Sequence, residues 1–179
     1  MTNSLPNEKI WYAITVKSRH DAKVYQRLID KNIECLYATY TAIRQWKDRK
    51  KKVEMPLFPG YVFVKINLWK ERVSVLETYG VSRFVQLSNE PEKISEQDIQ
   101  LIQGSQNNEA LNPQPEKFQD YKIGSEVKIL DGVFKGHKGS VVENIESKRF
   151  IIRIDSLMQA FSINVEGFSL KMEKNGANN

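Results

Sequence analysis

The sequence predicts an α+β protein of two domains: an N-terminal antiparallel sheet flanked by helices, then a small C-terminal β-barrel of the SH3 type. Strand-like and helix-like segments alternate through the first half of the 179-residue chain. A polar stretch with two prolines and three asparagines, residues 104–119, then has the composition of a linker. Only short strand-like segments follow it. We therefore expect domains at 8–103 and 120–174, joined by this linker.

The N-terminal domain opens with a predicted strand over residues 10–17, which is rich in β-branched and aromatic residues. Apolar residues at helical spacing predict a helix over 19–31, with Ser18 as its cap and Asn32 as its end. A second strand is expected around residues 34–40.

Two prolines and a glycine between residues 56 and 60 break any regular element. The segment that follows, 61–66, has the strongest strand pattern in the chain. Residues 69–79 then predict an amphipathic helix, capped by Gly80. Its expected inward side chains are Trp69, Val73 and Leu76.

A further strand over residues 81–87 is followed by Ser95, which has Asp98 three positions later. This spacing resembles a capping box and predicts a short helix through Ile102. In the second domain we expect strands at 126–130, 138–145, 150–155, 159–164 and 168–172. Their core would consist of Val127, Ile129, Val141, Val142, Ile152, Ile154 and Phe161.

The net charge of +5 is concentrated in one place, because the segment 44–52 contains six basic residues and one acid. Such a cluster is typical of a surface that binds nucleic-acid phosphates, although a solvated loop is the alternative. Trp46 lies inside the run and could stack on an unpaired base. The candidate nucleic-acid contacts here are Arg44, Trp46, Lys47, Arg49, Lys50, Lys51 and Lys52.

A second basic group lies where the first strand meets the first helix, and backbone N–H groups at such a junction also favour phosphate. Its members are Lys17, Arg19, His20 and Lys23. Aromatic residues form another group beside the Pro-Gly break. Phe58 and Tyr61 border that turn and could line an exposed docking pocket, whereas Trp11 and Phe63 could equally be core residues.

No catalytic constellation can be assembled from the sequence. Cys35 is the one cysteine, so we expect a buried structural thiol and no intramolecular disulfide. His20 and His137 fall in different predicted domains and lack metal-ligand spacing. We therefore expect a non-enzymatic protein without cofactor or metal. The absence of a secretory signal and of a long apolar run predicts a cytoplasmic protein that has no membrane partner.

These residues together resemble the NusG family of transcription factors. In the first half, Trp11-Tyr12, the run from Phe58 to Val64, and Gly80-Val81 before Phe84-Val85 are similar to the family's N-terminal domain. In the second half, the segment from Gly124 to Gly139 resembles the KOW motif. The KOW residues that carry this resemblance are Gly132, Phe134, Gly136 and Gly139.

The resemblance implies a monomeric bacterial factor that rides on elongating RNA polymerase and suppresses pausing and termination. In the family, an apolar pocket holds the β′ clamp helices, and the domain reaches the β subunit. The matching positions are Tyr12, Phe58, Pro59, Gly60 and Tyr61. The basic segment 44–52 and the Ser18–Asp21 corner are more similar to specialised paralogues such as RfaH and UpxY, which touch the non-template DNA strand and act on particular operons.

The family's C-terminal domain binds ribosomal protein S10 or the termination factor Rho. This chain has Ser-Leu-Met-Gln-Ala over residues 156–160 where the family has Phe-Gly-Arg, and Leu157 and Met158 are the candidate contacts. The missing glycine and arginine argue against binding of both partners, and of Rho more than of S10. Two alternatives remain open. One is a stand-alone RNA-binding protein of the KOW type, and the other is a housekeeping NusG that acts with Rho.

Overall fold

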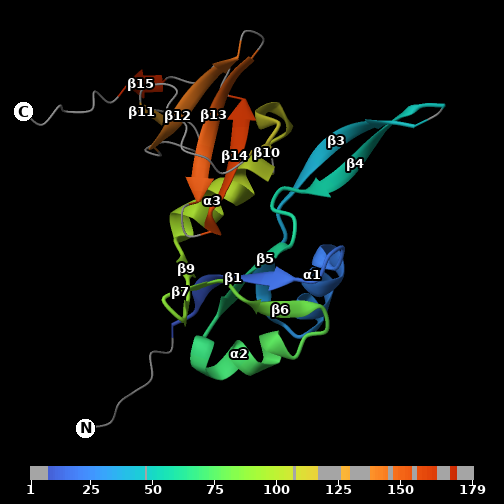
Figure 1. Ribbon diagram of the computed structural model, residues 1–179, viewed down its shortest axis with the longest axis vertical. Coiled ribbons are helices and arrows are strands. Elements are labelled where there is room, and N and C mark those ends of the chain that lie inside the picture. Colours follow the sequence, from blue (N-terminus) through green and yellow to red (C-terminus); the bar gives the residue numbers. More distant parts are fainter. Residues whose placement is uncertain are drawn as a thin grey trace, which may run out of the picture. The chain divides into compact units, whose positions relative to one another are not determined.

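The structure is a computed structural model that describes residues 8–46, 48–106, 108–116, 126–129, 138–144, 147–154, 157–164 and 170–172 (Figure 1). The chain divides into two compact units. The first comprises residues 1–39 and 58–99, and the second comprises residues 40–57 and 100–179. The domain limits expected from the sequence stay a prediction. Among the described residues, no helix is both long enough and apolar enough to cross a membrane.

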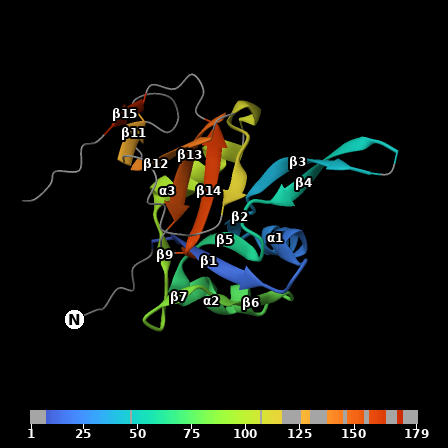
Figure 2. The ribbon, with the colours of Figure 1, turned by 45° about the horizontal axis from the view of Figure 1, so that its top comes forward.

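The first unit is built on an antiparallel sheet, which confirms the α+β class with antiparallel strands. Figures 1 and 2 show β1 lying between β5 and β6. The strand order is β2 (Glu34–Leu36), β5 (Tyr61–Ile66), β1 (Ile10–Val16) and β6 (Val81–Phe84), and β9 (Lys93–Ile94) also pairs with β1.

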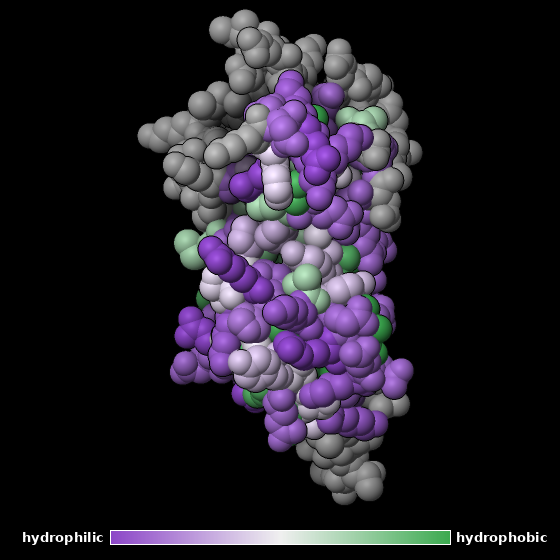
Figure 3. Space-filling view, turned by 90° about the vertical axis from the view of Figure 1, so that its right-hand side faces the viewer, coloured by the Kyte–Doolittle hydropathy of each residue, from purple (hydrophilic) through white to green (hydrophobic). Residues whose placement is uncertain are grey.

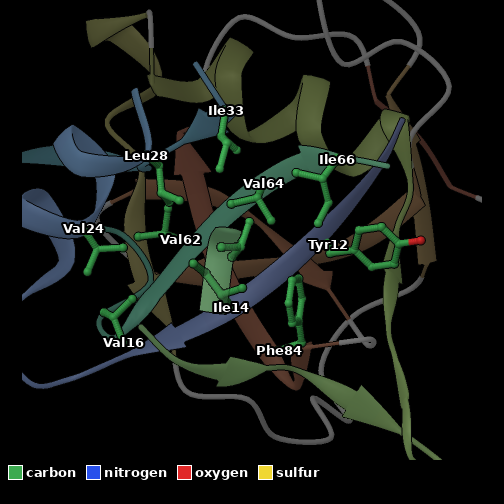
Figure 4. Packing of buried hydrophobic residues seen from close by; sticks show 11 residues of the cluster. Tyr12, Ile14, Val16, Val24, Leu28, Ile33, Val62, Val64, Ile66 and Phe84 are labelled. Atoms are coloured by element: carbon green, nitrogen blue, oxygen red, sulfur yellow. The ribbon is translucent and has the colours of Figure 1, made fainter. Parts of the chain in front are cut away.

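One face of this sheet packs against two helices, α1 (Asp21–Asp30) and α2 (Leu68–Leu76). Because side chains alternate along a strand, the even-numbered residues of β1 and β5 share this face. They meet Val24 and Leu28 of α1 (Figure 4). Val75 of α2 belongs to the same cluster. The burial of these aliphatic side chains stabilises the unit.

Trp11 lies on the opposite face of β1. Its indole ring is 3% exposed, and the Nζ of Lys65 lies 5.7 Å from the ring centroid. Its Nε1–H has no hydrogen-bond acceptor, although it is buried; no other described residue has such an atom. Lys65 itself forms ion pairs with Glu34 and Glu96 at N···O distances of 3.9 and 3.5 Å.

The predicted helix over 69–79 is present as α2, but its predicted inward face is wrong. Trp69 and Val73 are 70% and 64% exposed, whereas Val75 is fully buried. Asn67 caps the helix by accepting hydrogen bonds from the amides of Trp69 and Lys70. With the helix anchored there, Leu68 and Val75, seven positions apart, face the core, and Trp69 and Val73 therefore turn outward.

The expected caps at Ser18 and Gly80 are also wrong. The N-cap of α1 is His20, whose side chain makes no capping hydrogen bond to the helix, and the C-cap of α2 is Glu77. Gly80 instead lies in the following loop at φ +104, where a Cβ atom would approach Val24 Cγ2 to 2.7 Å. A glycine is required there by close packing as well as by backbone conformation.

The expected helix cap at Ser95 is confirmed. Ser95 Oγ accepts a hydrogen bond from the Asp98 amide at 3.0 Å and donates one to Asp98 Oδ2 at 2.7 Å. The helix that it opens is α3 (Glu96–Gln106). Before it, a two-stranded hairpin forms from β7 (Gln86–Leu87) and β8 (Glu90–Pro91).

The strand expected over 34–40 is divided in the structure. Its second part begins β3 (Thr39–Gln45), which pairs with β4 (Lys50–Pro56) in a separate two-stranded ribbon. The basic segment 44–52 therefore lies at the end of a β-hairpin. The lysines at 50–52 are strand residues, because the pairing with β3 outweighs the low β-propensity of lysine.

The second unit also contains an antiparallel sheet with the order β10-β14-β13-β12-β11-β15 (Figure 1). The strands are β10 (Gln114–Glu116), β11 (Glu126–Ile129), β12 (Lys138–Asn144), β13 (Ser147–Ile154), β14 (Gln159–Asn164) and β15 (Leu170–Met172). The five strands expected from the sequence are thus confirmed. Closure into an SH3-type barrel stays a prediction.

Of the expected core of this unit, Ile152, Ile154 and Phe161 are buried. The side chains of Val127, Ile129, Val141 and Val142 lie outside the described part of the structure. The expected linker 104–119 contains ordered elements, namely the end of α3, a 3₁₀ turn (Glu109–Leu111) and β10.

A polar network fastens β10 to the sheet. Arg149 donates from Nε to Ser162 Oγ at 2.8 Å and from Nη2 to the Asn112 and Ser162 carbonyls at 3.0 Å. Ser162 Oγ in turn donates to Glu116 Oε1 at 2.6 Å. Burial lowers the pKa of Arg149, and the negative charge of Glu116 opposes that shift. Because Ser162 is fully buried, the loss of any one partner would leave a buried polar group without its hydrogen bond, which is costly.

Candidate functional site

The segment Phe58–Tyr61 is a tight turn, which we call the Phe58–Tyr61 turn. The Tyr61 amide donates to the Phe58 carbonyl at 3.1 Å, and Gly60 has φ +86. Proline at the second position and a glycine with positive φ at the third define a type II β-turn. A Cβ at Gly60 would meet no atom within 4 Å, so the backbone conformation and not space requires glycine there.

The turn presents only part of its apolar side chains. Pro59 is exposed and Tyr61 is partly exposed, whereas Phe58 is 1% exposed. The Phe58 ring packs edge-on against Phe63, with centroids 5.8 Å apart. The expectation that Phe58 lines an exposed pocket therefore differs from the structure, where Phe58 is a core residue and Tyr61 offers the accessible ring.

Tyr12 does not join this group. It pairs with Val64 across the sheet, while Phe63 pairs with Ala13 and Tyr61 with Thr15, so Tyr12 lies on the opposite face. There it contacts Phe84, with ring centroids 6.1 Å apart, and its burial raises the pKa of its phenol (Figure 4). Tyr12 as a polymerase contact stays a prediction, and the structure places its ring on the other face of the sheet from Phe63 and Tyr61.

The four residues Lys17, Arg19, His20 and Lys23, which we call the basic corner, lie at the junction of β1 and α1 as expected. Lys17, Arg19 and Lys23 are exposed, and Arg19 has φ +60. His20 Nδ1 lies 2.9 Å from the Ser18 carbonyl oxygen. Hydrophilic residues dominate the side of the molecule shown in Figure 3, which is the side where Figure 1 draws α1.

Sequence reasoning missed two residues beside the basic corner, Tyr79 and Arg27. The Tyr79 ring is 65% exposed, and the Lys17 Nζ and Arg27 Cζ atoms lie 5.1 and 5.2 Å from its centroid. Arg27 also donates to the Tyr79 carbonyl at 2.9 Å, and the His20 ring lies edge-on at 6.0 Å. The sequence places Tyr79 at the end of the predicted helix, and it contains no signal for this cluster, because Lys17, Arg27 and Tyr79 are brought together only by the fold.

An exposed aromatic ring among cations is suited to nucleic acid. The ring can stack on a base, and the cations can neutralise the neighbouring phosphates. Lys31 extends the positive charge along α1, and its Nζ donates to Ser74 O at 2.8 Å and Thr78 Oγ1 at 2.9 Å.

In the second unit, the hairpin of β3 and β4 presents the basic segment. Its described members Arg44, Trp46, Arg49, Lys50, Lys51 and Lys52 are all exposed, and Lys47 lies outside the described residues. The Trp46 amide donates to the Arg49 carbonyl at 2.8 Å, which closes the end of the hairpin. The Trp46 ring is 55% exposed, and Lys51 Nζ lies 5.8 Å from its centroid.

The expected KOW residues Gly132, Phe134 and Gly136 lie outside the described part of the chain, and Gly139 is a residue of β12. The two candidate partner contacts differ in accessibility. Leu157 is 4% exposed, whereas Met158 is 66% exposed at φ +50. Of these two candidate contacts, Met158 is therefore the one whose side chain is accessible.

Cys35 is half-buried, with its Sγ 3.8 Å from the Tyr25 carbonyl. Burial first, and the charge of Glu34 second, raise the pKa of Cys35 to about 11. Across the described residues, no group of three or more His, Cys, Asp or Glu is arranged to hold a metal ion.

We expect Cys35 to react slowly with iodoacetamide at pH 8, because the thiolate is the nucleophile. The rate should keep increasing with pH up to about 11, whereas an ordinary thiol reaches its full rate once the pH passes about 8.5. The raised pKa stabilises the fold below the unfolded-state pKa of about 8.5, and this contribution is lost between that value and 11. Alkylation rates measured by mass spectrometry from pH 7 to 10.5 test this; a rate at pH 8 equal to that of the urea-unfolded chain would contradict it.

The fold and these surfaces define an α+β protein of antiparallel sheets that exposes basic and aromatic side chains at a strand–helix corner and on a hairpin. Residues 9–103 match the family model described as "Transcription termination factor nusG", which covers more than half of the chain. The chain therefore belongs to the NusG family.

Individual relatives agree with this assignment. The chain is 31% identical over 159 residues to the transcription termination/antitermination protein NusG of Helicobacter pylori, covering 80% of this chain and 87% of that one. It is 27% identical to the Campylobacter jejuni protein of the same name, covering 92% and 96%. A solved structure described as "Domain interaction in Thermotoga maritima NusG" matches with a TM-score of 0.54 and 22% identity over 93% of this chain and 98% of that one, a likeness of fold.

Proposed function

We propose that this protein is a non-enzymatic transcription factor that binds elongating RNA polymerase and suppresses pausing and termination in the cytoplasm of a bacterium. The relatives named above are termination/antitermination proteins. The Phe58–Tyr61 turn would contact the β′ clamp helices of the polymerase through Pro59 and Tyr61, and the same unit would reach the β subunit.

The observation that carries this proposal is the cluster of cations on the exposed Tyr79 ring. Lys17 of the basic corner directly follows β1, and its amide donates a hydrogen bond to the Gly80 carbonyl at 2.8 Å. The preceding residue, Val16, donates to the carbonyl of Gly60 in the turn at 2.9 Å. Backbone hydrogen bonds from two successive residues, Val16 and Lys17, therefore connect the Phe58–Tyr61 turn with the loop that carries Tyr79.

We assign the non-template DNA strand to this surface, because its bases are unpaired in the transcription bubble and can stack on tyrosine. The hairpin would supply further phosphate contacts. This second basic element supports a specialised, operon-specific factor of the RfaH and UpxY type. The exposed Met158 is the candidate contact for a second partner, ribosomal protein S10 being the first to test.

Tyr61→Ala is the test of the polymerase contact. We expect it to weaken binding to a reconstituted elongation complex by at least about tenfold, since a partly buried aromatic anchor is lost. Binding would be measured by fluorescence anisotropy of the labelled protein. Tyr25→Ala is the matched control, because Tyr25 is also partly buried but packs against Tyr37.

Two results would contradict the proposal. Wild-type affinity of Tyr61→Ala for the elongation complex would remove the turn from the contact. Binding of the full chain to structured RNA with a steep salt dependence, but not to polymerase, would favour the RNA-binding alternative.

A further inference from the structure

Asp21 connects the basic corner with the Phe58–Tyr61 turn. Its Oδ1 accepts a hydrogen bond from the Gly60 amide at 2.6 Å, and the side chain belongs to the first turn of α1. Asp21 directly follows His20 of the basic corner, while Gly60 is the third residue of the Phe58–Tyr61 turn. Since 39 positions separate the two residues in the chain, this bond joins two distant segments.

The carboxylate is well suited to this bond. Asp21 is 8% exposed, so little water competes for its oxygen. A hydrogen bond from an amide to an ionised carboxylate is shorter and stronger than one between neutral groups. The N-terminal end of α1 also favours a negative charge in its first turn.

The Gly60 amide belongs to the peptide group that defines the turn type. Type I and type II turns differ mainly by a flip of the peptide between their second and third residues, here Pro59 and Gly60. Flipping that peptide reverses the direction of the Gly60 N–H. An acceptor fixed at Asp21 therefore favours the type II arrangement, in which Gly60 has φ +86.

We propose that Asp21 is a positioning residue that holds the Pro59–Gly60 peptide in its type II orientation and so couples the polymerase-binding turn to the basic corner. This inference rests on the proposed function of both surfaces. Asp21 contacts neither partner itself. Binding of the non-template strand at the corner orders the start of α1, which orders the turn through Asp21, and polymerase binding acts in the reverse direction with the same coupling free energy.

The test compares Asp21→Ala, which removes the acceptor, with Asp21→Asn, which keeps an uncharged one. The matched control is Asp30→Asn, because Asp30 is an exposed acid on the same helix whose Oδ1 accepts a local bond from Gln26. The Gly60 amide proton, observed by NMR, should move upfield and exchange faster with solvent in Asp21→Ala, with a smaller change in Asp21→Asn and none in the control.

Affinity is then measured for elongation complexes assembled with and without the non-template strand. In the wild type the strand should tighten binding. Asp21→Ala should bind the complete complex roughly tenfold to a hundredfold more weakly, as expected for a lost bond to a charged acceptor, and should lose most of the advantage given by the strand. Asp21→Asn, which is expected to retain the fold, should recover part of both.

The outcomes separate this inference from the proposed function. If the wild type failed to bind either complex, the proposed function and the inference would both fall. If the wild type bound but Asp21→Ala and Asp21→Asn kept its affinity and its dependence on the strand, the inference alone would fall. A uniform loss of affinity with an unchanged strand advantage would show a structural role without coupling and would also overturn it.

Discussion

Replacing Lys50, Lys51 and Lys52 together with glutamine is expected to weaken binding of single-stranded DNA by about a hundredfold at 0.1 M salt. All three lysines are exposed on β4, and each phosphate contact on a single strand contributes about 0.7 to the slope of log K against log salt concentration. The slope should therefore fall by about 2. Fluorescence anisotropy with a labelled oligonucleotide between 0.05 and 0.4 M salt (a range of about one decade) measures both quantities.

The matched control is a triple variant in which Lys9, Lys70 and Lys93 become glutamine. These lysines are also exposed, and Lys9 takes part in an exposed ion pair with Glu71 that contributes little to stability. The control removes the same charge from other elements. Equal losses in the two variants would mean that the net charge of the protein, and not the hairpin, attracts DNA.

Phe58→Ala is expected to lower the free energy of unfolding by about 3–5 kcal/mol. The ring is 1% exposed and packs on Phe63, so its removal leaves a cavity in the core. Urea unfolding followed by circular dichroism measures the effect. Pro59→Ala is the control, since Pro59 is exposed in the same turn and should cost only about 0.4–1 kcal/mol through the unfolded chain.

A loss below about 1 kcal/mol in Phe58→Ala would contradict the core position of this residue. The expected loss also limits the use of Phe58 variants in binding experiments, because weak binding could then reflect unfolding. Tyr61, which is partly exposed in the same turn, is the sharper probe of the polymerase contact.

Local signals were sufficient for much of the fold. The run of β-branched and aromatic residues over 61–66 predicts β5, and Ser95 with Asp98 predicts the start of α3, because both depend on neighbouring residues alone. The Pro-Gly pair at 59–60 predicts a break, and the structure adds its type. Each of these features depends on chain chemistry within one turn or one strand.

Features set by tertiary packing could not be predicted in the same way. In α2, apolar residues occur around most of the helix, so the sequence does not show that Val75 packs inward and Trp69 outward. Consecutive lysines have a low strand propensity, and only pairing with β3 makes residues 50–52 a strand. The cluster at Tyr79 requires side chains from the corner after β1, from α1 and from a loop to meet, which no single segment reveals.

The three tryptophans differ in burial and can therefore serve as intrinsic fluorescence probes. Trp11 is buried without an acceptor for its indole N–H, whereas Trp46 and Trp69 are 55% and 70% exposed. Indole emission shifts to shorter wavelength in an apolar environment, so the three rings emit differently. With Trp69 replaced by phenylalanine, the short-wavelength emission follows the sheet of the first unit, and the long-wavelength emission follows the basic hairpin. Folding and DNA contact can then be observed in one unlabelled sample.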